Sequence, residues 1–208
     1  MKIYVINGPT GIGKTDFSVN LAESLQERGR VLLLQGKRNS RSNIEDYFQK
    51  DGMITYDIAD YFQGLAPLST VIVNETPNLD FIISPLLEDK YNYNGEDMAK
   101  ILSEVNYDYV VIDDVAKNII SANTSVEILS PDTLNSTVNA DAFFINKVSD
   151  DFDVRTHKDF IDQAPGKFLG TVKEGEYFKD VINNLVNDAQ VEVAKIGFFE
   201  RLKSGFRK

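Results

Sequence analysis

The sequence has no cysteine and a single histidine. Without cysteine there is no disulfide framework, no thiolate metal site and no cysteine nucleophile, so a reducing cytosol is the expected compartment. His157 cannot hold a metal ion by itself. No apolar run approaches the roughly 18 residues that cross a bilayer. The opening residues MKIYVINGP carry one lysine and a short apolar run, which indicates a first strand and not a signal peptide.

Positive charge is also scarce over most of the chain. Lys and Arg number 22 against 32 Asp and Glu, which gives a net charge of −10 and a pI near 4.6. An acidic surface repels a polyanion, so general binding to nucleic acid is not expected. The exception is 195–208, which holds five basic residues and one acidic residue. The positive charge is therefore concentrated at one end.

Apolar side chains are plentiful, at 42% of 208 residues, which suits the core of one ordinary α/β domain. Short runs that are apolar almost throughout recur along the chain, as expected for parallel strands covered on both faces. The predicted strands are Lys2–Asn7, Val31–Leu34, Leu79–Ser84, Tyr109–Asp113, Val126–Ser130, Ala142–Val148 and Phe168–Val172, with a further short strand at Val71–Asn74.

Helices are predicted between these strands at Lys14–Arg28, ended by Gly29, and at Gly95–Glu104. A third is expected at 177–189, where apolar residues at helical spacing form one stripe. The alternation predicts a doubly wound, mostly parallel sheet of about seven strands with helices on both faces.

A glycine-rich segment between the first strand and the first helix matches G-x-x-x-x-G-K-[ST], the phosphate-loop motif. Its glycines let backbone N–H groups surround phosphate oxygens, and the helix N-terminus adds partial positive charge. Lys14 is expected to reach the β and γ phosphates, and the Thr15 hydroxyl to bind Mg²⁺. The alternative is a glycine-rich turn that binds nothing. The candidate nucleotide-binding residues here are Gly8, Pro9, Thr10, Gly11, Ile12, Gly13, Lys14, Thr15 and Asp16.

A second motif, Tyr109–Asp114, is four apolar residues followed by two acids. At the end of a neighbouring strand, Asp113 is the candidate Walker B carboxylate that holds Mg²⁺ directly or through water. Asp114 has two interpretations: it orients an attacking water, or it is a solvated loop carboxylate. Lys14, Asp113 and Asp114 are the candidate catalytic residues.

Taken in order, these segments resemble the MinD/ParA family of P-loop ATPases, and more loosely the cytoplasmic domains of bacterial tyrosine kinases, which have a C-terminal tyrosine cluster that is missing here. The resemblance implies the P-loop fold, binding of ATP or ADP with Mg²⁺, and a nucleotide-dependent homodimer. Asn146 falls where the family commonly has an asparagine that contacts adenine. The matching segments are GPTGIGKTDFSVNLAESLQERGRVLLL at 8–34, APLSTVIVNETPNLDFIISP at 66–85, YDYVVIDD at 107–114 and SVEILSPDTLNS at 125–136.

The C-terminal segment KIGFFERLKSGFRK is similar to the membrane-targeting helix of the MinD branch of this family. About 14 residues are too few for a stable free helix in water, so the segment is expected to order at an anionic lipid surface. The alternative is a terminal helix that docks on its own domain or on a partner. We expect a nucleotide-binding domain at 1–190 and a membrane-targeting helix at 191–208. The candidate membrane residues are Ile196, Phe198, Phe199, Arg201, Leu202, Lys203, Phe206 and Arg207.

The chain also departs from the family pattern. Pro9 stands where the family has a signature lysine, the usual switch aspartate is absent from 35–39, and no proline follows Asp113. Either hydrolysis is slow and uses Asp114 or a partner's side chain, or the protein binds nucleotide without turnover. Three basic residues follow the second strand: Lys37, Arg38 and Arg41. They either supply positive charge near the phosphates in place of the missing lysine or belong to a solvated loop.

These features lead to one expected function and two alternatives. The first is an ATP-binding switch that is cytoplasmic and peripheral on the inner face of the cell membrane. It is expected to position an unidentified partner protein or protein complex in cell division, in partitioning, or in the assembly of a pilus or secretion system. Its expected partners are an anionic membrane surface, a second copy of the chain and that protein. The alternatives are a non-hydrolysing adaptor of the same fold and a small-molecule P-loop kinase or ligase.

Overall fold

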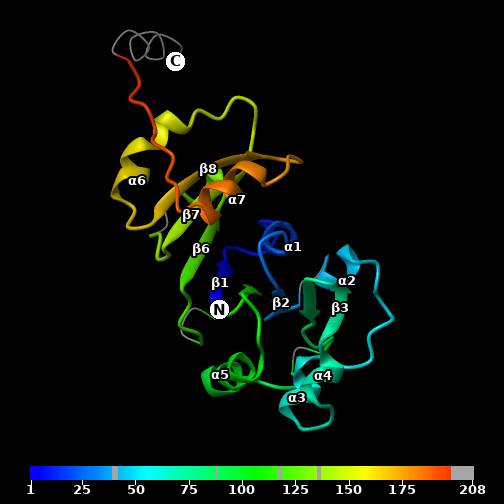
Figure 1. Cartoon of the computed structure of the whole chain (residues 1–208). Coiled ribbons are helices and arrows are strands. Elements are labelled where there is room, and N and C mark those ends of the chain that lie inside the picture. The colour runs from blue at the N-terminus through cyan, green and yellow to red at the C-terminus, as the bar shows by residue number, and fades with distance from the viewer. Residues whose placement is uncertain (39–41, 88, 117–118, 135–136, 198–208) are drawn as a thin grey trace. The chain divides into compact units, whose positions relative to one another are not determined.

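The computed structural model describes residues 1–38, 42–87, 89–116, 119–134 and 137–197 (Figure 1). Across these residues, eight strands lie in one mostly parallel sheet in the order β3-β4-β2-β5-β1-β6-β7-β8, which confirms the predicted fold class. The strands are β1 (Lys2–Asn7), β2 (Val31–Gln35), β3 (Val73–Thr76), β4 (Leu79–Ile82), β5 (Tyr109–Asp113), β6 (Thr124–Leu129), β7 (Ala142–Val148) and β8 (Lys167–Lys173).

The helices are α1 (Lys14–Leu25), α2 (Ile44–Tyr47), α3 (Ile58–Phe62), α4 (Leu68–Val71), α5 (Gly95–Glu104), α6 (Lys158–Gln163) and α7 (Lys179–Val186), with 3₁₀ turns η1 (Pro131–Thr133) and η2 (Val154–His157). The chain divides into two compact units, 1–126 and 127–208.

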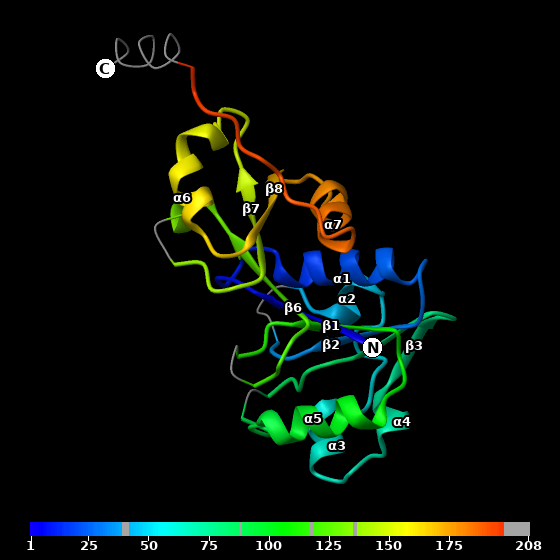
Figure 2. The ribbon, with the colours of Figure 1, turned by 60° about the vertical axis from the view of Figure 1, so that its left-hand side comes forward.

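The first unit is built on the parallel strands β4, β2, β5 and β1. The register pairs Ile6 with Asp113 and Gln35 with Asp113, so β1, β2 and β5 bring their carboxyl ends to one edge. Helix α1 lies on one face and α3 and α5 lie on the other (Figure 2). Because both faces are covered, β2 is buried at every position. This edge places the loop after β1 beside the end of β5.

Helix α1 ends at Leu25, three residues before the predicted end at Arg28. Gly29 lies beyond the helix, and a Cβ at this position would be 2.5 Å from the Asp108 carboxylate. The glycine is therefore required by the close approach of Asp108, and the expectation that it ends the helix is wrong.

The outer strand β3 runs antiparallel to β4, with a bulge between Asn74 and Thr76. The short strand expected at Val71–Asn74 is thus found two residues later, because Val71 closes α4. The Lys50 ammonium donates to the Asn74 carbonyl at 2.8 Å and pairs with the Glu75 carboxylate. A lysine therefore covers part of the free edge.

In the second unit, β7 and β8 are parallel and carry helices on both faces. Phe143 contacts Phe160 of α6, whereas Phe144 contacts Phe178, the N-cap of α7. Successive residues of a strand point to opposite faces, so the pair anchors one helix on each. The helix predicted at 177–189 is shorter, at Lys179–Val186, and 189–197 forms neither helix nor strand.

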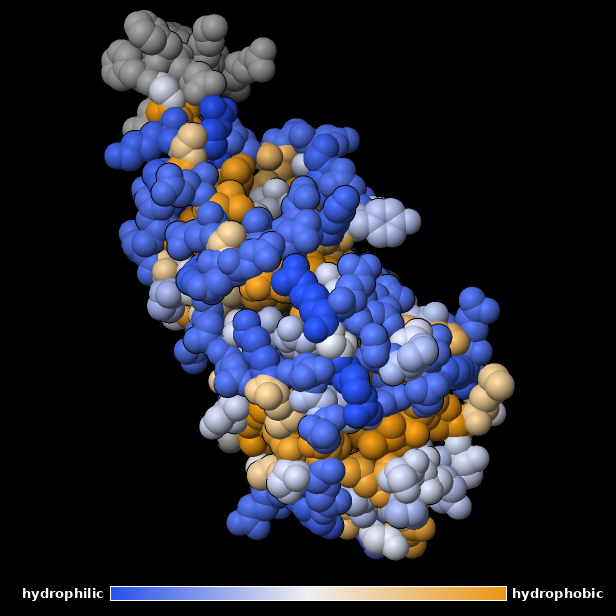
Figure 3. Space-filling view, in the orientation of Figure 1, coloured by the Kyte–Doolittle hydropathy of each residue, from blue (hydrophilic) through white to orange (hydrophobic). Residues whose placement is uncertain are grey.

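The face seen in Figure 3 is largely hydrophilic, with apolar side chains gathered over the lower part of the first unit. Leu65, Leu86 and Leu87 of this unit are each more than three-fifths exposed. Among the described residues, no helix combines the length and the apolar character needed to cross a bilayer.

Candidate functional site

The glycine-rich loop joins the end of β1 to the start of α1, as predicted. Gly11 and Gly13 have φ of 76° and 94°, a region that favours glycine, and Gly13 is the N-cap of α1. A Cβ at Gly11 would meet no atom within 4 Å, so the loop faces open space there. The loop thus brings a helix N-terminus to the carboxyl edge of the sheet, a geometry suited to an anion.

Lys14 is a buried cation with 4% of its surface exposed. Its ammonium donates to the carbonyls of Gly8 at 2.9 Å and Pro9 at 3.0 Å. It also lies 3.3 Å from an oxygen of the Asp114 carboxylate. Lys14 is therefore held beneath its own loop by neutral acceptors and one counter-ion.

Asp113 is fully buried at the end of β5. It accepts hydrogen bonds from Thr15 Oγ1 at 2.6 Å and Ser18 Oγ at 3.1 Å. Burial raises the pKa of this carboxyl to about 6, although the two hydrogen bonds lower it; Asp114 raises it further and Lys14 lowers it. The structure thus brings together Thr15 and Asp113, the two predicted magnesium ligands.

This donor set fits Mg²⁺. A hard cation takes oxygen ligands, and here a hydroxyl and a strongly desolvated carboxylate are already in contact. The described residues contain no group of three or more His, Cys, Asp or Glu able to hold a metal. A magnesium ion held by Thr15 and Asp113 would take its other ligands from phosphate and water, the usual arrangement for nucleotide sites.

Ser18 was not among the predicted site residues. It lies one helical turn after Lys14 and donates to both the Lys14 carbonyl and Asp113. Its position at i+4 places it on the same face of the helix as Lys14, which is the signal that would have found it.

Asp114 is the first residue beyond β5 and has a φ of 57°. Its N–H donates to the Ile6 carbonyl at 3.0 Å, and its carboxylate, 24% exposed, faces Lys14. The interpretation of Asp114 as a solvated loop carboxylate is therefore wrong, because it is the counter-ion of Lys14. Its assignment to the orientation of water remains a prediction.

The two remaining predicted nucleotide-binding residues are Asp16 and Asn146. Asp16 lies in the first turn of α1, where burial raises its pKa and a hydrogen bond with Tyr47 lowers it. Asn146 lies on β7 in the second unit, where its side-chain oxygen accepts from the Lys147 N–H at 2.9 Å. Its contact with adenine remains a prediction.

Of the predicted membrane residues, only Ile196 is described, and it is half-buried in a segment without helix or strand. The prediction of a helix at 191–208 is therefore wrong for 191–197, and for 198–208 it remains untested. Lying outside the described residues are Phe198, Phe199, Arg201, Leu202, Lys203, Phe206 and Arg207.

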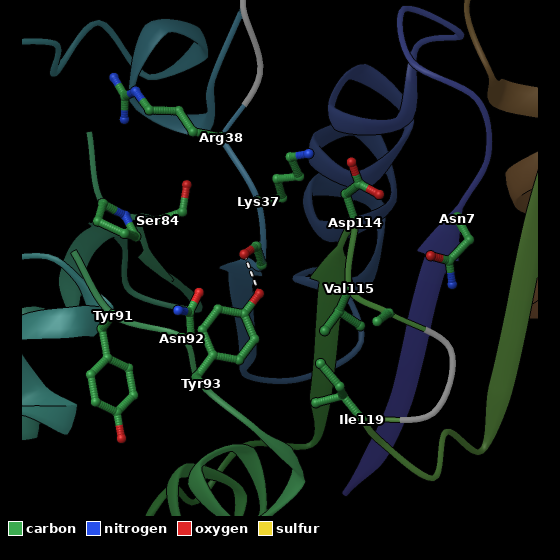
Figure 4. A pocket seen from close by; sticks show the side chains of 13 residues that line it. Asn7, Lys37, Arg38, Ser84, Tyr91, Asn92, Tyr93, Asp114, Val115 and Ile119 are labelled. Atoms are coloured by element: carbon green, nitrogen blue, oxygen red, sulfur yellow. Dashed lines mark hydrogen bonds between the residues drawn. The ribbon is translucent and has the colours of Figure 1, made fainter. Parts of the chain in front are cut away.

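A pocket of about 520 Å³ opens at the carboxyl ends of β1, β2, β4 and β5, beside Asp114 (Figure 4). Next to the lining residue Gly36, Gln35 is fully buried, donates to Asn43 at 3.1 Å and accepts from Ser84, which lines the pocket, at 3.1 Å. The lining residues are Asn7, Gly36, Lys37, Arg38, Ser84, Pro85, Tyr91, Asn92, Tyr93, Asp114, Val115, Ala116 and Ile119.

Arg38 and Lys37 line this pocket in different ways. Arg38 pairs with the buried Glu45 carboxylate at 2.5 Å and points away from Asp114 (Figure 4). The interpretation of this segment as a solvated loop is thus wrong for Arg38. Lys37 is exposed and points toward Asp114. Arg41 lies outside the described residues.

Comparison with known proteins found no matching family model. The chain is similar to the septum site-determining protein MinD of Helicobacter pylori, with 25% identity over 118 residues, or 55% of this chain and 44% of that protein. It thus spans less than half the length of the curated relatives it matches.

Two solved structures share the fold. MinD complexed with Mg-ADP from Pyrococcus horikoshii has a TM-score of 0.68 and 19% identity, covering 87% of this chain and 84% of that one. A putative plasmid partition protein from Borrelia burgdorferi bound to AMPPNP has a TM-score of 0.67 and 17% identity, covering 90% and 98%. The chain is thus similar in sequence to MinD over about half of its length, and it shares its fold with MinD and with a plasmid partition protein.

Proposed function

We propose that this chain is a nucleotide-dependent switch that binds ATP and ADP with Mg²⁺ at residues 8–15. The observation that carries the proposal is the buried Lys14 ammonium, held by the loop next to the paired Thr15 and Asp113. A buried cation with two oxygen ligands for a metal at its side is suited to a polyphosphate. Structures of the same fold hold Mg-ADP or AMPPNP, which supports the choice of ligand.

The residues of the site have separate roles in this proposal. Lys14 binds phosphate oxygens, and Thr15 with Asp113 holds Mg²⁺, which offsets negative charge on the phosphates. Asp114 must release Lys14 when phosphate arrives, since both anions compete for one ammonium. Once released, its carboxylate is free to orient water, and we propose slow hydrolysis on this basis.

Isothermal titration of the purified chain with ADP and Mg²⁺ tests nucleotide binding. We expect Lys14→Ala to weaken binding by about a hundredfold, because it removes a charged partner of the phosphates from a buried site. Lys2→Ala is the matched control, since Lys2 lies at the opposite end of β1 from the loop. Equal affinities of Lys14→Ala and the wild type would refute the proposal.

The switch is proposed to be a cytoplasmic protein that binds the membrane peripherally through residues 191–208. It is proposed to act there as a homodimer that recruits a further protein. The support is the basic and aromatic composition of 195–208 and the exposed apolar side chains of the first unit. Two copies of a weak lipid-binding segment bind far more tightly than one, so dimerisation would control membrane residence.

Sedimentation with vesicles of phosphatidylglycerol tests this part. The full chain with ATP should pellet, whereas Arg201→Glu combined with Lys203→Glu should remain in the supernatant. Equal pelleting of both proteins would refute the membrane role. Phosphate release with and without vesicles separates the switch from a non-hydrolysing adaptor, which would bind ATP and release none.

A further inference from the structure

Asp114 joins the phosphate loop to the neighbouring pocket. Its carboxylate is 3.3 Å from the Lys14 ammonium, and the same residue lines the 520 Å³ pocket. A phosphate chain held by Lys14 and long enough to pass Asp114 would therefore extend into this pocket. The inference below rests on the proposed binding of nucleotide.

Lys37 is the available positive charge in this pocket. Its side chain points toward Asp114, and none of the acidic side chains that the structure describes pairs with it (Figure 4). Arg38, the other cation of the lining, is already neutralised by the buried Glu45. An anion in the pocket would therefore meet Lys37.

The backbone that carries Lys37 is fixed on both sides of the pocket. The Gly36 N–H donates to the Asp113 carbonyl at 2.7 Å, and the Gly36 carbonyl accepts from the Tyr93 hydroxyl. A Cβ at Gly36 would lie 2.7 Å from the Asp114 carbonyl, so the two loops are in direct contact. Lys37 therefore extends from an anchored residue close to the end of β5.

We propose that Lys37 contacts the terminal phosphate of a bound nucleoside triphosphate and so lets the protein distinguish the triphosphate from the diphosphate. Lys14 serves phosphates that both nucleotides share, whereas Lys37 approaches from the pocket, which only the longer ligand enters. The contact is an ion pair in a partly solvated site and requires no covalent step.

The test is titration of the full chain with AMPPNP and with ADP, each with Mg²⁺. A charge-assisted contact predicts that Lys37→Ala weakens AMPPNP binding by about tenfold and leaves ADP binding within about twofold. Lys37→Arg, which keeps the charge, should restore AMPPNP binding. Lys2→Ala, which removes the same charge at the far end of β1, should change neither affinity.

The outcomes separate this inference from the proposed function. A wild type that binds neither nucleotide refutes both. If the wild type binds both nucleotides and Lys37→Ala weakens both affinities equally, or weakens neither, only the role of Lys37 is overturned. Urea unfolding of each variant shows whether the fold is intact, and Lys37→Gln replaces Lys37→Ala if that variant does not fold.

Discussion

Replacement of Asp113 by asparagine should stabilise the protein in the absence of nucleotide and metal. Asp113 is fully buried, and its pKa is raised by that burial from 3.8 to about 6. Its ionised form is therefore disfavoured in the folded protein. Asparagine has nearly the same shape, and the hydroxyls of Thr15 and Ser18 can each donate to or accept from its amide.

The magnitude follows from the two pKa values. A difference of about two pH units at 1.36 kcal/mol each makes ionised Asp113 cost about 3 kcal/mol of unfolding free energy near neutral pH. Because the folded-state pKa is the higher one, the wild type does not bear this cost below pH 3.8. The cost grows as pH rises from 3.8 and is complete above about 6. The advantage of Asp113→Asn should thus fall from about 3 kcal/mol at about pH 7.5 to about 1 kcal/mol at about pH 4.5.

Urea unfolding in EDTA at both pH values measures this difference. Asp51→Asn, at an exposed carboxylate of the same unit, is the matched control. The reasoning is refuted if Asp113→Asn is less stable than the wild type at about pH 7.5, or if its advantage is the same at both pH values. Added Mg²⁺ and ADP should stabilise the wild type more than the variant.

Two further substitutions test the contacts around the loop. Asp114→Asn should strengthen ADP binding in EDTA by about tenfold, because it removes the competing counter-ion of Lys14; an unchanged Kd in calorimetry would contradict this. Arg38→Ala should lower the unfolding free energy by about 3 kcal/mol in urea, because it leaves the buried Glu45 unpaired. The double variant Arg38→Ala, Glu45→Gln should recover most of that loss, and no recovery would mean that the pair has another role.

The strands were predictable because burial on both faces requires continuous apolar runs. The bounds of β1, β5 and β7 match the prediction at both ends. Strand β3 was displaced because Asn74 and Glu75 interrupt its apolar pattern at the sheet edge. The helices α2, α3 and α4 have four or five residues each, little more than one turn, so helical spacing cannot reveal them.

The site was predictable where neighbouring strands determine it. The motif places Thr15 at the start of α1, and the pairing of β1 with β5 brings Asp113 beside it. The pairs Lys14 with Asp114 and Arg38 with Glu45 depend on the direction of long side chains, which sequence spacing does not specify. The positive φ of Asp114, which directs its carboxylate toward the loop, is likewise a property of the folded backbone.

The outer strand limits how two copies of this protein can join. A free strand edge is a template for sheet extension, but β3 has only four residues, a bulge, and a carbonyl already engaged by Lys50. Growth of a shared sheet through this strand is therefore blocked. At this edge, self-association has to use loops or helices instead, and such contacts can be made and broken without exposing β3 to aggregation.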